Sequence, residues 1–309
     1  MAVAAPSRFS GELAGRVIRA ILTLAVVLVM ALGGITAYLL YSIMMGRNDV
    51  ETVTPQSSFQ SNYVTLSFTD PQGGEHEGWL LLGLKGAPAI ILCHGHNSNR
   101  SELLALGSVL RQNHFNVYVF NFAGPRTKHK YSDLGLWQTG DLLAAIDKVA
   151  KQPGVNPHRV GLFGVNTGGY AALAAAEQNP LVKALAVDSV YDDPRQMLEA
   201  QVDLALGGSS KWFRMLPNAG FYLATLGKKR PPVLAQLAKL GDMPKLFIQG
   251  GDSPLLARAT EVVYDSAPQP KRLLVLSHSY TTLASGAVKK EYEDQVLNFF
   301  LQNLPLRAD

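Results

Sequence analysis

A long apolar segment lies near the start of the chain, and short apolar runs separated by polar stretches follow it. No charged residue occurs from Ala20 to Met45. As a helix this segment would measure about 39 Å at about 1.5 Å per residue, against about 30 Å for the hydrocarbon core of a bilayer. A cleaved signal peptide usually has a shorter apolar region, about 7–15 residues, and the uniformity of the run disfavours a buried helix. The pattern therefore predicts a transmembrane signal-anchor helix over residues 20–45.

The charges on either side of this run predict its orientation. Three arginines precede it, namely Arg8, Arg16 and Arg19. Arg47 follows it, together with the acidic residues Asp49 and Glu51. Because cytoplasmic flanks carry the excess of Lys and Arg, residues 1–19 are predicted to be a cytoplasmic segment. The folded domain is then on the extracytoplasmic side of a single-pass membrane protein.

The rest of the chain alternates between strand-like and helix-like patterns. Residues 46–57 are polar and read as a linker, and residues 58–309 as one domain. Alternating apolar positions at residues 63–68 and 79–84, with a turn at Pro71–Gly74, predict an antiparallel pair. Helical spacing is seen at Leu142–Ala150 and Tyr170–Glu177. Six further apolar runs predict strands: Ile90–Cys93, Val117–Phe122, Val160–Val165, Ala184–Asp188, Leu246–Gly250 and Leu273–Leu276. The alternation predicts an α/β fold.

The sequence from Val160 to Tyr170, VGLFGVNTGGY, has the form of a nucleophile elbow, G-x-S-x-G, with Asn166 in place of serine. A short buried strand and an alanine-rich helix flank it, and glycines allow the tight turn between them. The turn holds its central side chain at the end of a sheet, where a substrate can reach it. Here that side chain is a carboxamide, which is a very poor nucleophile, so no acyl-enzyme is expected.

These elements, in this order over residues 58–304, resemble the α/β-hydrolase superfamily, nearest to its serine-aminopeptidase, prolyl-oligopeptidase and dienelactone-hydrolase branches. The resemblance implies a mostly parallel eight-stranded sheet with helices on both faces and a cap insertion. It also implies an oxyanion hole made by the backbone N–H groups of His96 and Thr167. His94 stands in the His-Gly turn after the third strand, where it is expected to brace the turn.

The family's other catalytic positions are degenerate in this chain. The pattern H-G-x-x-D-P aligns with residues 249–254, so that Ser253 takes the acid position and Asp252 lies one residue early. The histidine is expected about five residues past the eighth strand, where Thr281 stands, and His278 is about three residues early. Three departures together, with the nucleophile position occupied by Asn166, indicate that the triad has been lost.

The stretch between the sixth and seventh strands, residues 191–243, is expected to form a cap or lid. Its apolar positions are expected either to cover the elbow or to pack as core: Met197, Leu198, Trp212, Phe213, Leu216, Phe221, Tyr222 and Leu226. Asp192 and Asp193 follow the sixth strand, where some members of the family carry an alternative acid. Capping of a helix that begins at Pro194 explains them more simply.

Composition narrows the classes of function. The 309 residues carry a net charge of +4, and their basic residues are scattered, so nucleic acid is an unexpected partner. The cluster Lys228-Lys229-Arg230 reads as a solvated loop. The single cysteine, Cys93, is expected to be a buried apolar residue that forms no intramolecular disulfide. No C-x-x-C or H-E-x-x-H motif is present, and we expect neither a metal nor a cofactor.

Three interpretations of function follow. The first is a membrane-anchored pseudoenzyme that binds a small molecule, a peptide or a protein through the elbow pocket. The second is an active ester or peptide hydrolase with nonstandard groups, such as Thr167 or a water placed by Asp252 and His278. The third is a structural membrane-associated interaction protein. The identity of a protein partner is not readable from the sequence, and a fold alone does not imply activity.

Overall fold

The computed structural model describes residues 8–45, 51, 53–57, 62–122, 132–208, 211–225, 233–283 and 286–306. Its centre is an eight-stranded sheet in the order β1-β2-β4-β3-β5-β6-β7-β8. β1 and β2 pair antiparallel with each other, β2 pairs antiparallel with β4, and the remaining neighbours are parallel. The strands are β1 Tyr63–Thr69, β2 Glu75–Leu81, β3 Ala87–Cys93, β4 Asn116–Phe120, β5 Val155–Val165, β6 Val182–Asp188, β7 Lys245–Gly250 and β8 Lys271–Leu276.

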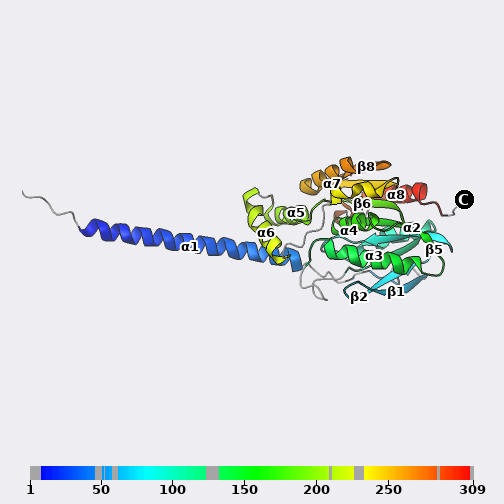
Figure 1. The fold of residues 1–309 in the computed structure, drawn as a ribbon, viewed down its shortest axis with the longest axis horizontal. Helices are drawn as coiled ribbons and strands as arrows, with labels where there is room; N and C mark the ends of the chain where they lie inside the picture. The colour runs from blue at the N-terminus through cyan, green and yellow to red at the C-terminus, as the bar shows by residue number, and fades with distance from the viewer. Residues whose placement is uncertain are drawn as a thin grey trace, which may run out of the picture.

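Helices connect the parallel strands and cover both faces of the sheet (Figure 1). α3, α4 and α7 pack on one face, and α2 and α8 pack on the other. The helices are α1 Arg8–Met45, α2 Leu104–Gln112, α3 Leu136–Ala150, α4 Thr167–Ala176, α5 Pro194–Leu206, α6 Lys211–Ala224, α7 Pro254–Ser266 and α8 Ala287–Asn303, with 3-10 turns at Arg100–Leu103, Val233–Ala235, Leu237–Leu240 and Tyr280–Thr282. The predicted fold class and the predicted strands are confirmed.

The central strand β3 is apolar throughout because it is buried on both faces. Every residue of β3 is buried, and its side chains alternate between two apolar clusters, one on each face of the sheet. Ala89 and Ile91 belong to one cluster, and Ile90 and Leu92 to the other. Cys93 lies at the end of this strand, buried and unpaired as expected.

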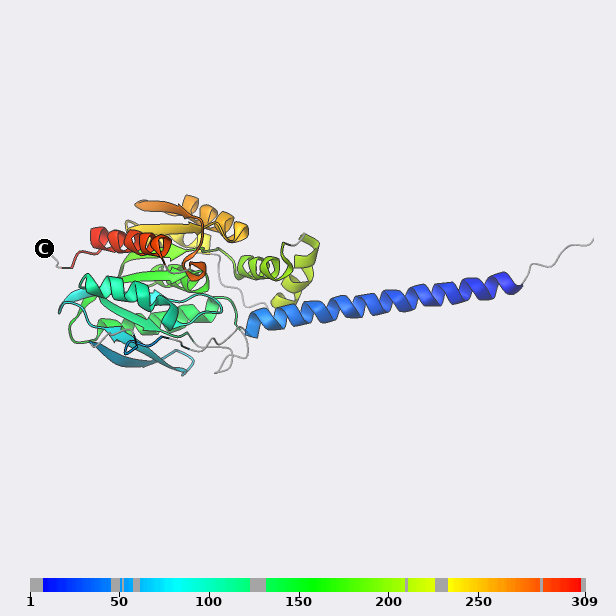
Figure 2. The same ribbon diagram turned by 180° about the vertical axis from the view of Figure 1, so that it is seen from behind.

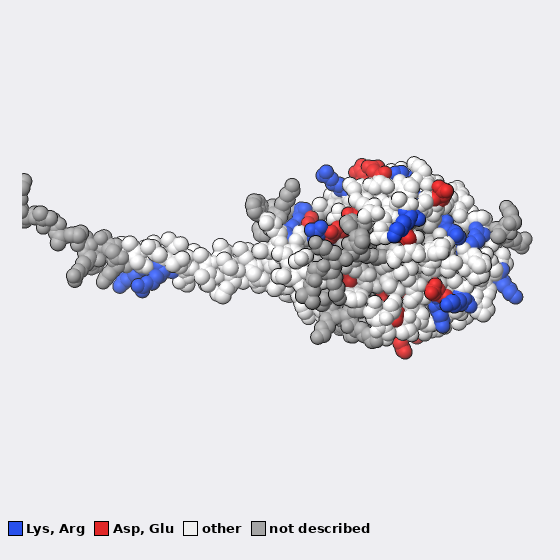
Figure 3. Space-filling model, in the orientation of Figure 1, with Lys and Arg blue, Asp and Glu red and all other residues white. Residues whose placement is uncertain are grey.

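Helix α1 projects from the domain as a long rod (Figures 1 and 2). It begins at Arg8 rather than at residue 20, since residues 8–19 contain no proline and continue the helix. Its segment Leu13–Met45 is long and apolar enough to cross a membrane, with a mean hydropathy of 2.4. Figure 3 shows the Lys and Arg side chains of the described part of α1 confined to its N-terminal end, where Arg16 and Arg19 lie.

The C-terminal end of α1 is docked on the domain. Ile43 and Met44 are buried in the apolar cluster that also contains α3 and α4. The backbone N–H of Ser132 donates to the carbonyl of Met44 at 2.6 Å. Leu40 lies against Gly220 of α6, where a Cβ atom would be 2.8 Å from its Cδ2. The helix is therefore joined to the domain by packing as well as by the chain.

Glu51, in the predicted linker, is also fixed to the domain. Its carboxylate accepts two hydrogen bonds from Arg100, at 2.8 and 3.1 Å, and one from the Asn121 amide at 2.6 Å. The Arg100 guanidinium stacks on Trp79, 3.7 Å from the ring centroid. A bidentate, partly buried Arg–carboxylate pair is among the stronger ion pairs. This pair ties the chain after α1 to β2 and to the loop after β4.

The segment between β6 and β7 forms α5 and α6 and two short 3-10 turns. Met197, Leu198 and Phe221 are buried, but Leu216 and Tyr222 are exposed and do not cover the elbow. They point away because α6 packs on α5 through its other face. The side chains of Trp212, Phe213, Leu226 and the basic cluster Lys228-Lys229-Arg230 lie outside the described residues.

The crossing of α4 over β3 requires glycine at position 168. A Cβ atom there would overlap the backbone carbonyls of Cys93 and His94. We expect Gly168→Ala to lower the free energy of unfolding by about 1–3 kcal/mol, the usual range for overpacking. Gly140→Ala in α3 is the matched control, since its Cβ would be no closer than 3.8 Å to its neighbour Pro71. That variant should gain about 0.5–1 kcal/mol from helix propensity.

Chemical denaturation of the full chain in detergent, followed by circular dichroism, measures both effects. Equal changes in the two variants would contradict the close packing of α4 on β3.

Candidate functional site

Asn166 stands at the tip of a strained turn between β5 and α4. Its backbone has φ 38° and ψ −102°, a conformation that costs a non-glycine residue about 1–3 kcal/mol. The turn is held on both sides, because its N–H donates to the carbonyl of Asp188 at 2.8 Å and its carbonyl accepts from Tyr170 at 2.8 Å. The predicted elbow is present, and it presents the side chain of Asn166 at the carboxyl edge of the sheet.

The carboxamide oxygen of Asn166 occupies the predicted oxyanion hole. Its Oδ1 accepts a hydrogen bond from the backbone N–H of His96 at 2.7 Å and one from that of Thr167 at 2.6 Å. These are the two donors that the family resemblance assigned to the oxyanion of a substrate. The side chain of the elbow residue therefore fills the position that a developing negative charge would take.

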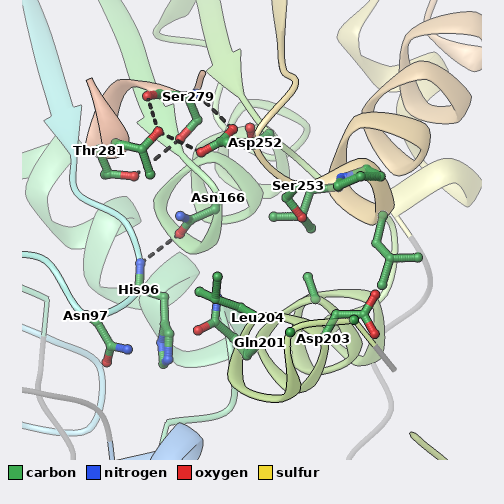
Figure 4. Close-up of a pocket in the computed structure, with 18 residues that line it drawn as sticks. His96, Asn97, Asn166, Gln201, Asp203, Leu204, Asp252, Ser253, Ser279 and Thr281 are labelled. Atoms are coloured by element: carbon green, nitrogen blue, oxygen red, sulfur yellow. Dashed lines mark hydrogen bonds between the residues drawn. The ribbon is translucent and has the colours of Figure 1, made fainter. Parts of the chain in front are cut away.

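The orientation of this amide is fixed by its partners. Two converging N–H donors require an acceptor, so the oxygen of Asn166 must face His96 and Thr167, and the nitrogen must point away. Figure 4 shows the nitrogen directed toward the loop that carries Ser279 and Thr281. Gly95 leaves the room for this arrangement, because a Cβ there would be 2.7 Å from Oδ1 and 2.8 Å from Nδ2.

Asp252, rather than Ser253, faces the loop where the catalytic histidine is expected. Its Oδ1 accepts from the backbone N–H of Ser279 at 3.0 Å, and its Oδ2 accepts from the Thr282 hydroxyl at 2.6 Å. Ser253 begins α7 without a side-chain capping bond and lines the same pocket. A turn one residue shorter than the family pattern thus still brings a carboxylate to the histidine loop.

The histidine position is occupied by Thr281, which lines the pocket, with its Oγ1 3.3 Å from the Ser279 hydroxyl. His278 does not line the pocket. Its ring is exposed, and its Nδ1 lies 3.0 Å from the hydroxyl of Ser277. His278 and Asp252 therefore do not form a dyad at Asn166.

Among the described residues, His96 is the one histidine that lines the pocket, and it is a weak base. Burial lowers the pKa of His96 to about 4, so the ring is neutral at pH 7. Its Nε2 is buried without a hydrogen-bond partner. A general base is most effective when its pKa lies near the working pH. The side chain of His96 is thus poorly suited to activating a nucleophile.

His94 braces the turn after β3, as the sequence analysis expected. Its Nδ1 lies 2.9 Å from the carbonyl of Gly95, and its Nε2 accepts from the backbone N–H of Phe122 at 3.2 Å. Burial lowers the pKa of His94 to about 4, which favours this neutral form. The two bonds connect the loop after β3 to the residues after β4 and hold the backbone N–H of His96 in place.

Asp188 lies at the end of β6, close to the site. The sequence predicted only that a strand ends there. Its carboxylate is fully buried and accepts from the backbone N–H of Tyr280 at 2.8 Å, the Tyr292 hydroxyl at 2.6 Å and the Ser189 hydroxyl at 2.8 Å. Burial raises the pKa of Asp188 to about 6, against the hydrogen bonds that lower it. The signal in the sequence that could have identified Asp188 is its position as the one carboxylate at the end of an apolar strand.

Asp192 and Asp193 cap and brace α5, as expected. Asp193 forms a capping box with Gln196, and its Oδ1 accepts from the backbone N–H of Arg195 at 2.8 Å. Asp192 accepts from the backbone N–H of Leu234 at 2.8 Å. The Asp193 carboxylate thus caps α5, the Asp192 carboxylate bonds the 3-10 turn Val233–Ala235, and neither residue lines the pocket at Asn166.

A cavity of about 570 Å³ lies in front of Asn166, between the carboxyl edge of the sheet and α5 (Figure 4). Its polar lining combines amides, hydroxyls and carboxylates: Asn97, Asn166, Gln201, Ser279, Thr281, Asp203 and Asp252. Its apolar lining includes Leu204, Leu255 and Leu256. The volume suits a small ligand, and the mixed lining suits one with both polar and apolar parts.

A second polar cluster lies where the turn between β1 and β2 meets α3, beside the residues that follow β4. The ligating atoms of Asp70, His76 and Asp141 lie within 4.8 Å of one another, which is close enough to hold a metal ion. An ion pair accounts for the arrangement, since His76 Nε2 is 3.1 Å from Asp70 and its Nδ1 is 3.1 Å from the Asn121 carbonyl. The sequence analysis did not identify this cluster.

The pKa of Asp70 agrees with the ion-pair explanation. Burial raises the pKa of this carboxyl, but hydrogen bonds from Gly74, His76 and Gln72 outweigh it and hold the pKa below its ordinary value. Two of those bonds come from the backbone of the hairpin turn, at 2.7 Å each. The carboxylate therefore has a structural task in closing the β1–β2 turn.

The elbow, the strand order and the oxyanion-hole geometry define the α/β-hydrolase class. A family model described as "alpha/beta hydrolase fold" matches residues 88–226. Together with the matching solved structures, this shows the α/β-hydrolase fold.

Two relatives show how far the likeness extends in sequence. The uncharacterized protein YfhR of Escherichia coli O157:H7 is 28% identical over 253 residues, covering 78% of this chain and 81% of that protein. The thiohydrolase aneE of Aspergillus aculeatus is 27% identical over 121 residues, covering 38% of each chain.

Two solved structures share the fold. The esterase Pf2001 of Pyrococcus furiosus has a TM-score of 0.65 at 16% identity, covering 85% of this chain and 99% of its own. A dienelactone hydrolase of Anabaena variabilis has a TM-score of 0.58 at 20% identity, covering 79% of this chain and 99% of its own. At these identities the likeness is one of fold.

The two hydrogen bonds to Asn166 predict a graded response to substitution at this position. Asn166→Ala should lower the free energy of unfolding by about 1–3 kcal/mol, because it leaves the His96 and Thr167 N–H groups unpaired. Asn166→Gly loses the same bonds but relieves the strained backbone, so it should cost less. Asn166→Asp keeps an acceptor for both donors and should be the most stable of the three.

Thermal unfolding of the full chain in detergent at pH 7 ranks these variants. An alanine variant as stable as the parent would show that the two donors do not need the carboxamide.

Proposed function

We propose that this chain is a membrane-anchored, non-catalytic member of the α/β-hydrolase superfamily that binds a ligand in the pocket at Asn166. The observation that carries the proposal is the carboxamide oxygen of Asn166, bonded to both oxyanion-hole donors at 2.7 and 2.6 Å. An elbow residue that fills the oxyanion hole cannot attack a carbonyl, and it also blocks the carbonyl's place.

The surroundings of Asn166 support the same conclusion. The acid position still holds a carboxylate, Asp252, but its oxygens are engaged by Ser279 and Thr282. The position from which a histidine would act holds Thr281. A serine hydrolase needs nucleophile, base and orienting acid together, and their contributions are strongly coupled. An acid alone, with neither nucleophile nor base, provides no route to an acyl-enzyme.

The alternative of an active hydrolase with nonstandard groups has less support. The Thr167 side chain is fully buried, and its hydroxyl is 3.3 Å from Asn166 Oδ1, directed at the same oxygen as its backbone N–H. A water placed jointly by Asp252 and His278 would require both side chains at one point, whereas His278 is exposed and outside the pocket lining. No described group lining the pocket combines reactivity with a suitable base.

The ligand is expected to be a small molecule or a peptide with both polar and apolar parts. The nitrogen of Asn166 points toward the Ser279–Thr281 loop and offers two N–H donors to an acceptor on the ligand (Figure 4). Asp203 and Asp252 disfavour a strongly anionic ligand, since both carboxylates line the cavity. Leu204, Leu255 and Leu256 offer the apolar side. A purely structural role at the membrane, the third interpretation, would leave this cavity unused.

The native chain should show no serine-hydrolase chemistry. We expect a fluorophosphonate probe not to label it, and short-chain nitrophenyl esters to turn over no faster than with heat-denatured protein. Asn166→Ser alone should remain at this level, because no base stands within the pocket to activate the hydroxyl. Loss of a triad member costs working enzymes up to about 10⁶ in turnover.

The double variant Asn166→Ser/Thr281→His supplies the missing base beside the native Asp252. It should gain probe labelling at position 166, and the same variant with Asp252→Asn should lose most of that gain. A single Asn166→Ser variant with turnover near 1–10³ s⁻¹, roughly the range of ordinary enzymes, would show that only the nucleophile is missing. Labelling of the native chain would contradict the proposal directly.

The membrane anchor is a separate part of the proposal. The apolar segment Leu13–Met45, exposed except near its C-terminal end, supports insertion of α1, and the arginines at its start support a cytoplasmic N-terminus. Alkaline carbonate washing should leave the full-length protein in the membrane pellet. Outer layers of the cell are first removed, and the membrane that holds the protein is kept intact. Protease added to the outside should then digest the C-terminal domain. Release by carbonate would contradict the anchor, and protection of the domain would contradict the orientation.

A further inference from the structure

The helix α6 exposes an apolar stripe. Among residues 214–224 of α6, the exposed positions follow the i, i+1, i+4, i+7, i+8 spacing of one helical face, and all of them are apolar: Met215, Leu216, Ala219, Tyr222 and Leu223. The four large side chains are between 52% and 70% exposed. A helix on the surface of a globular domain ordinarily turns such a face toward the core. A contiguous exposed apolar face marks a contact with another apolar phase or partner.

Two polar side chains of α6, those of Arg214 and Asn218, are turned toward α5 instead. Arg214 pairs with Asp203 of α5 at 3.0 Å and lies 3.9 Å from Glu199. The Asn218 amide donates to Glu199 at 2.8 Å. These bonds, together with the buried Phe221, fix which face of α6 points outward. The outward apolar stripe is therefore determined by the packing of α6 on α5.

The position of α6 beside α1 identifies what covers the stripe. Leu40 of α1 contacts Gly220 of α6, and both views of the fold place α5 and α6 on the side from which α1 projects (Figures 1 and 2). A span that begins after Arg19 reaches about 30 Å, the thickness of the hydrocarbon core, after about 20 residues. That point falls at Leu39 and Leu40, the level at which α6 packs.

Aromatic residues mark the same level on α1. Tyr38 and Tyr41 are strongly exposed, and tyrosines are enriched where a transmembrane helix crosses the boundary between hydrocarbon and headgroups. Tyr222 of α6 is exposed in the same way. A helix with an apolar face at this depth has the properties of an interfacial helix, which lies in the membrane surface with that face in the acyl boundary.

We propose that α6 is an interfacial membrane helix, whose stripe Met215, Leu216, Ala219, Tyr222 and Leu223 lies in the outer boundary of the bilayer that α1 spans. The inference rests on the proposed anchoring of α1. The occupant is lipid, because the stripe continues the exposed apolar surface of α1 at the level where that helix leaves the bilayer. The domain is then held against the membrane at two points.

This second contact places the candidate pocket close to the bilayer. α5, on which α6 packs, supplies Gln201, Asp203 and Leu204 to the pocket lining, and Gly207 and Gly208 follow at its C-terminal end. Leu204 is 75% exposed, so this apolar side chain lines the pocket and also faces the outside of the domain. Docking of α6 holds this rim of the pocket at the membrane surface.

Site-specific fluorescence in nanodiscs that hold one copy of the full chain tests the proposal. The native Cys93 does not interfere, because it is buried and burial raises the pKa of its thiol far above the ordinary value. A nitrobenzoxadiazole label is attached to Leu223→Cys on the stripe. Val27→Cys in α1 is the anchor control, and Leu301→Cys in α8, at the far end of the domain, is the aqueous control (Figure 1).

Lipids that carry a nitroxide near the headgroup or near the chain end, and iodide in the water, serve as quenchers. The label at Val27→Cys should be quenched by the chain-end nitroxide. The label at Leu223→Cys should be quenched by the headgroup nitroxide, with several-fold weaker quenching by iodide than at Leu301→Cys. The label at Leu301→Cys should respond to iodide alone.

The outcomes separate the two proposals. A label at Val27→Cys that no lipid quencher reaches would overturn the anchor, and the interfacial helix with it. Lipid quenching at Val27→Cys together with full iodide quenching at Leu223→Cys would overturn the interfacial helix alone. The label at Leu223→Cys could be shielded from iodide only in discs that hold two copies of the chain. That result would show that a second chain covers the stripe, and it would also overturn the proposal.

Discussion

Two backbone N–H groups, those of His96 and Thr167, converge on one point at the carboxyl edge of the sheet, and an acceptor must occupy that point. The rest of the site follows from this constraint. In a hydrolase the donors wait for the oxyanion of the substrate, and water or substrate satisfies them in turn. Here Asn166 Oδ1 satisfies them permanently, at 2.7 and 2.6 Å. The same contact fixes the amide orientation, directs Nδ2 at the pocket and requires glycine at position 95.

Much of this arrangement is readable from the sequence, and the limits of that reading have physical causes. Apolar runs and glycines located the strands and the elbow, because burial on both faces and close helix–strand packing leave few alternatives. The N–H groups of His96 and Thr167 could be named from the sequence because backbone donors do not depend on side-chain identity, and in the structure both donate to Asn166 Oδ1. That the Asn166 side chain would turn back onto them was not predicted, because a rotamer is decided by partners distant in sequence. Ser253 and Asp252 were both candidates for the acid position, because spacing alone does not show how a turn shortened by one residue places its carboxylate.

Asp188 and α6 also depend on contacts between residues that are distant in the sequence, which local patterns do not predict. The carboxylate of Asp188 joins β6 to Tyr280 and Tyr292, which are about a hundred residues away in the chain, and no local pattern signals the pairing. The apolar residues of α6 were expected to cover the elbow or to join the core. Leu216 and Tyr222 face outward and Phe221 is buried, because Arg214 and Asn218 contact acidic residues of α5, and this ion pair and hydrogen bond decide the rotation of the helix about its axis. Periodicity reveals that a helix has two faces, but tertiary contacts decide which one is buried.

The elbow of this chain combines a strained turn with two hydrogen bonds that its own side chain accepts. A strained backbone of the kind seen at Asn166 costs about 1–3 kcal/mol, and in an enzyme the surrounding fold must offset it. Each hydrogen bond from a backbone N–H returns about 0.5–1.5 kcal/mol when both partners are buried. Two such bonds are of the same size as the strain, so the carboxamide stabilises locally the conformation that a serine would hold for chemistry. Activity often requires groups that are left unsatisfied until substrate binds, at a cost in stability. In this chain the donors are satisfied from within, and the turn keeps its geometry without a substrate.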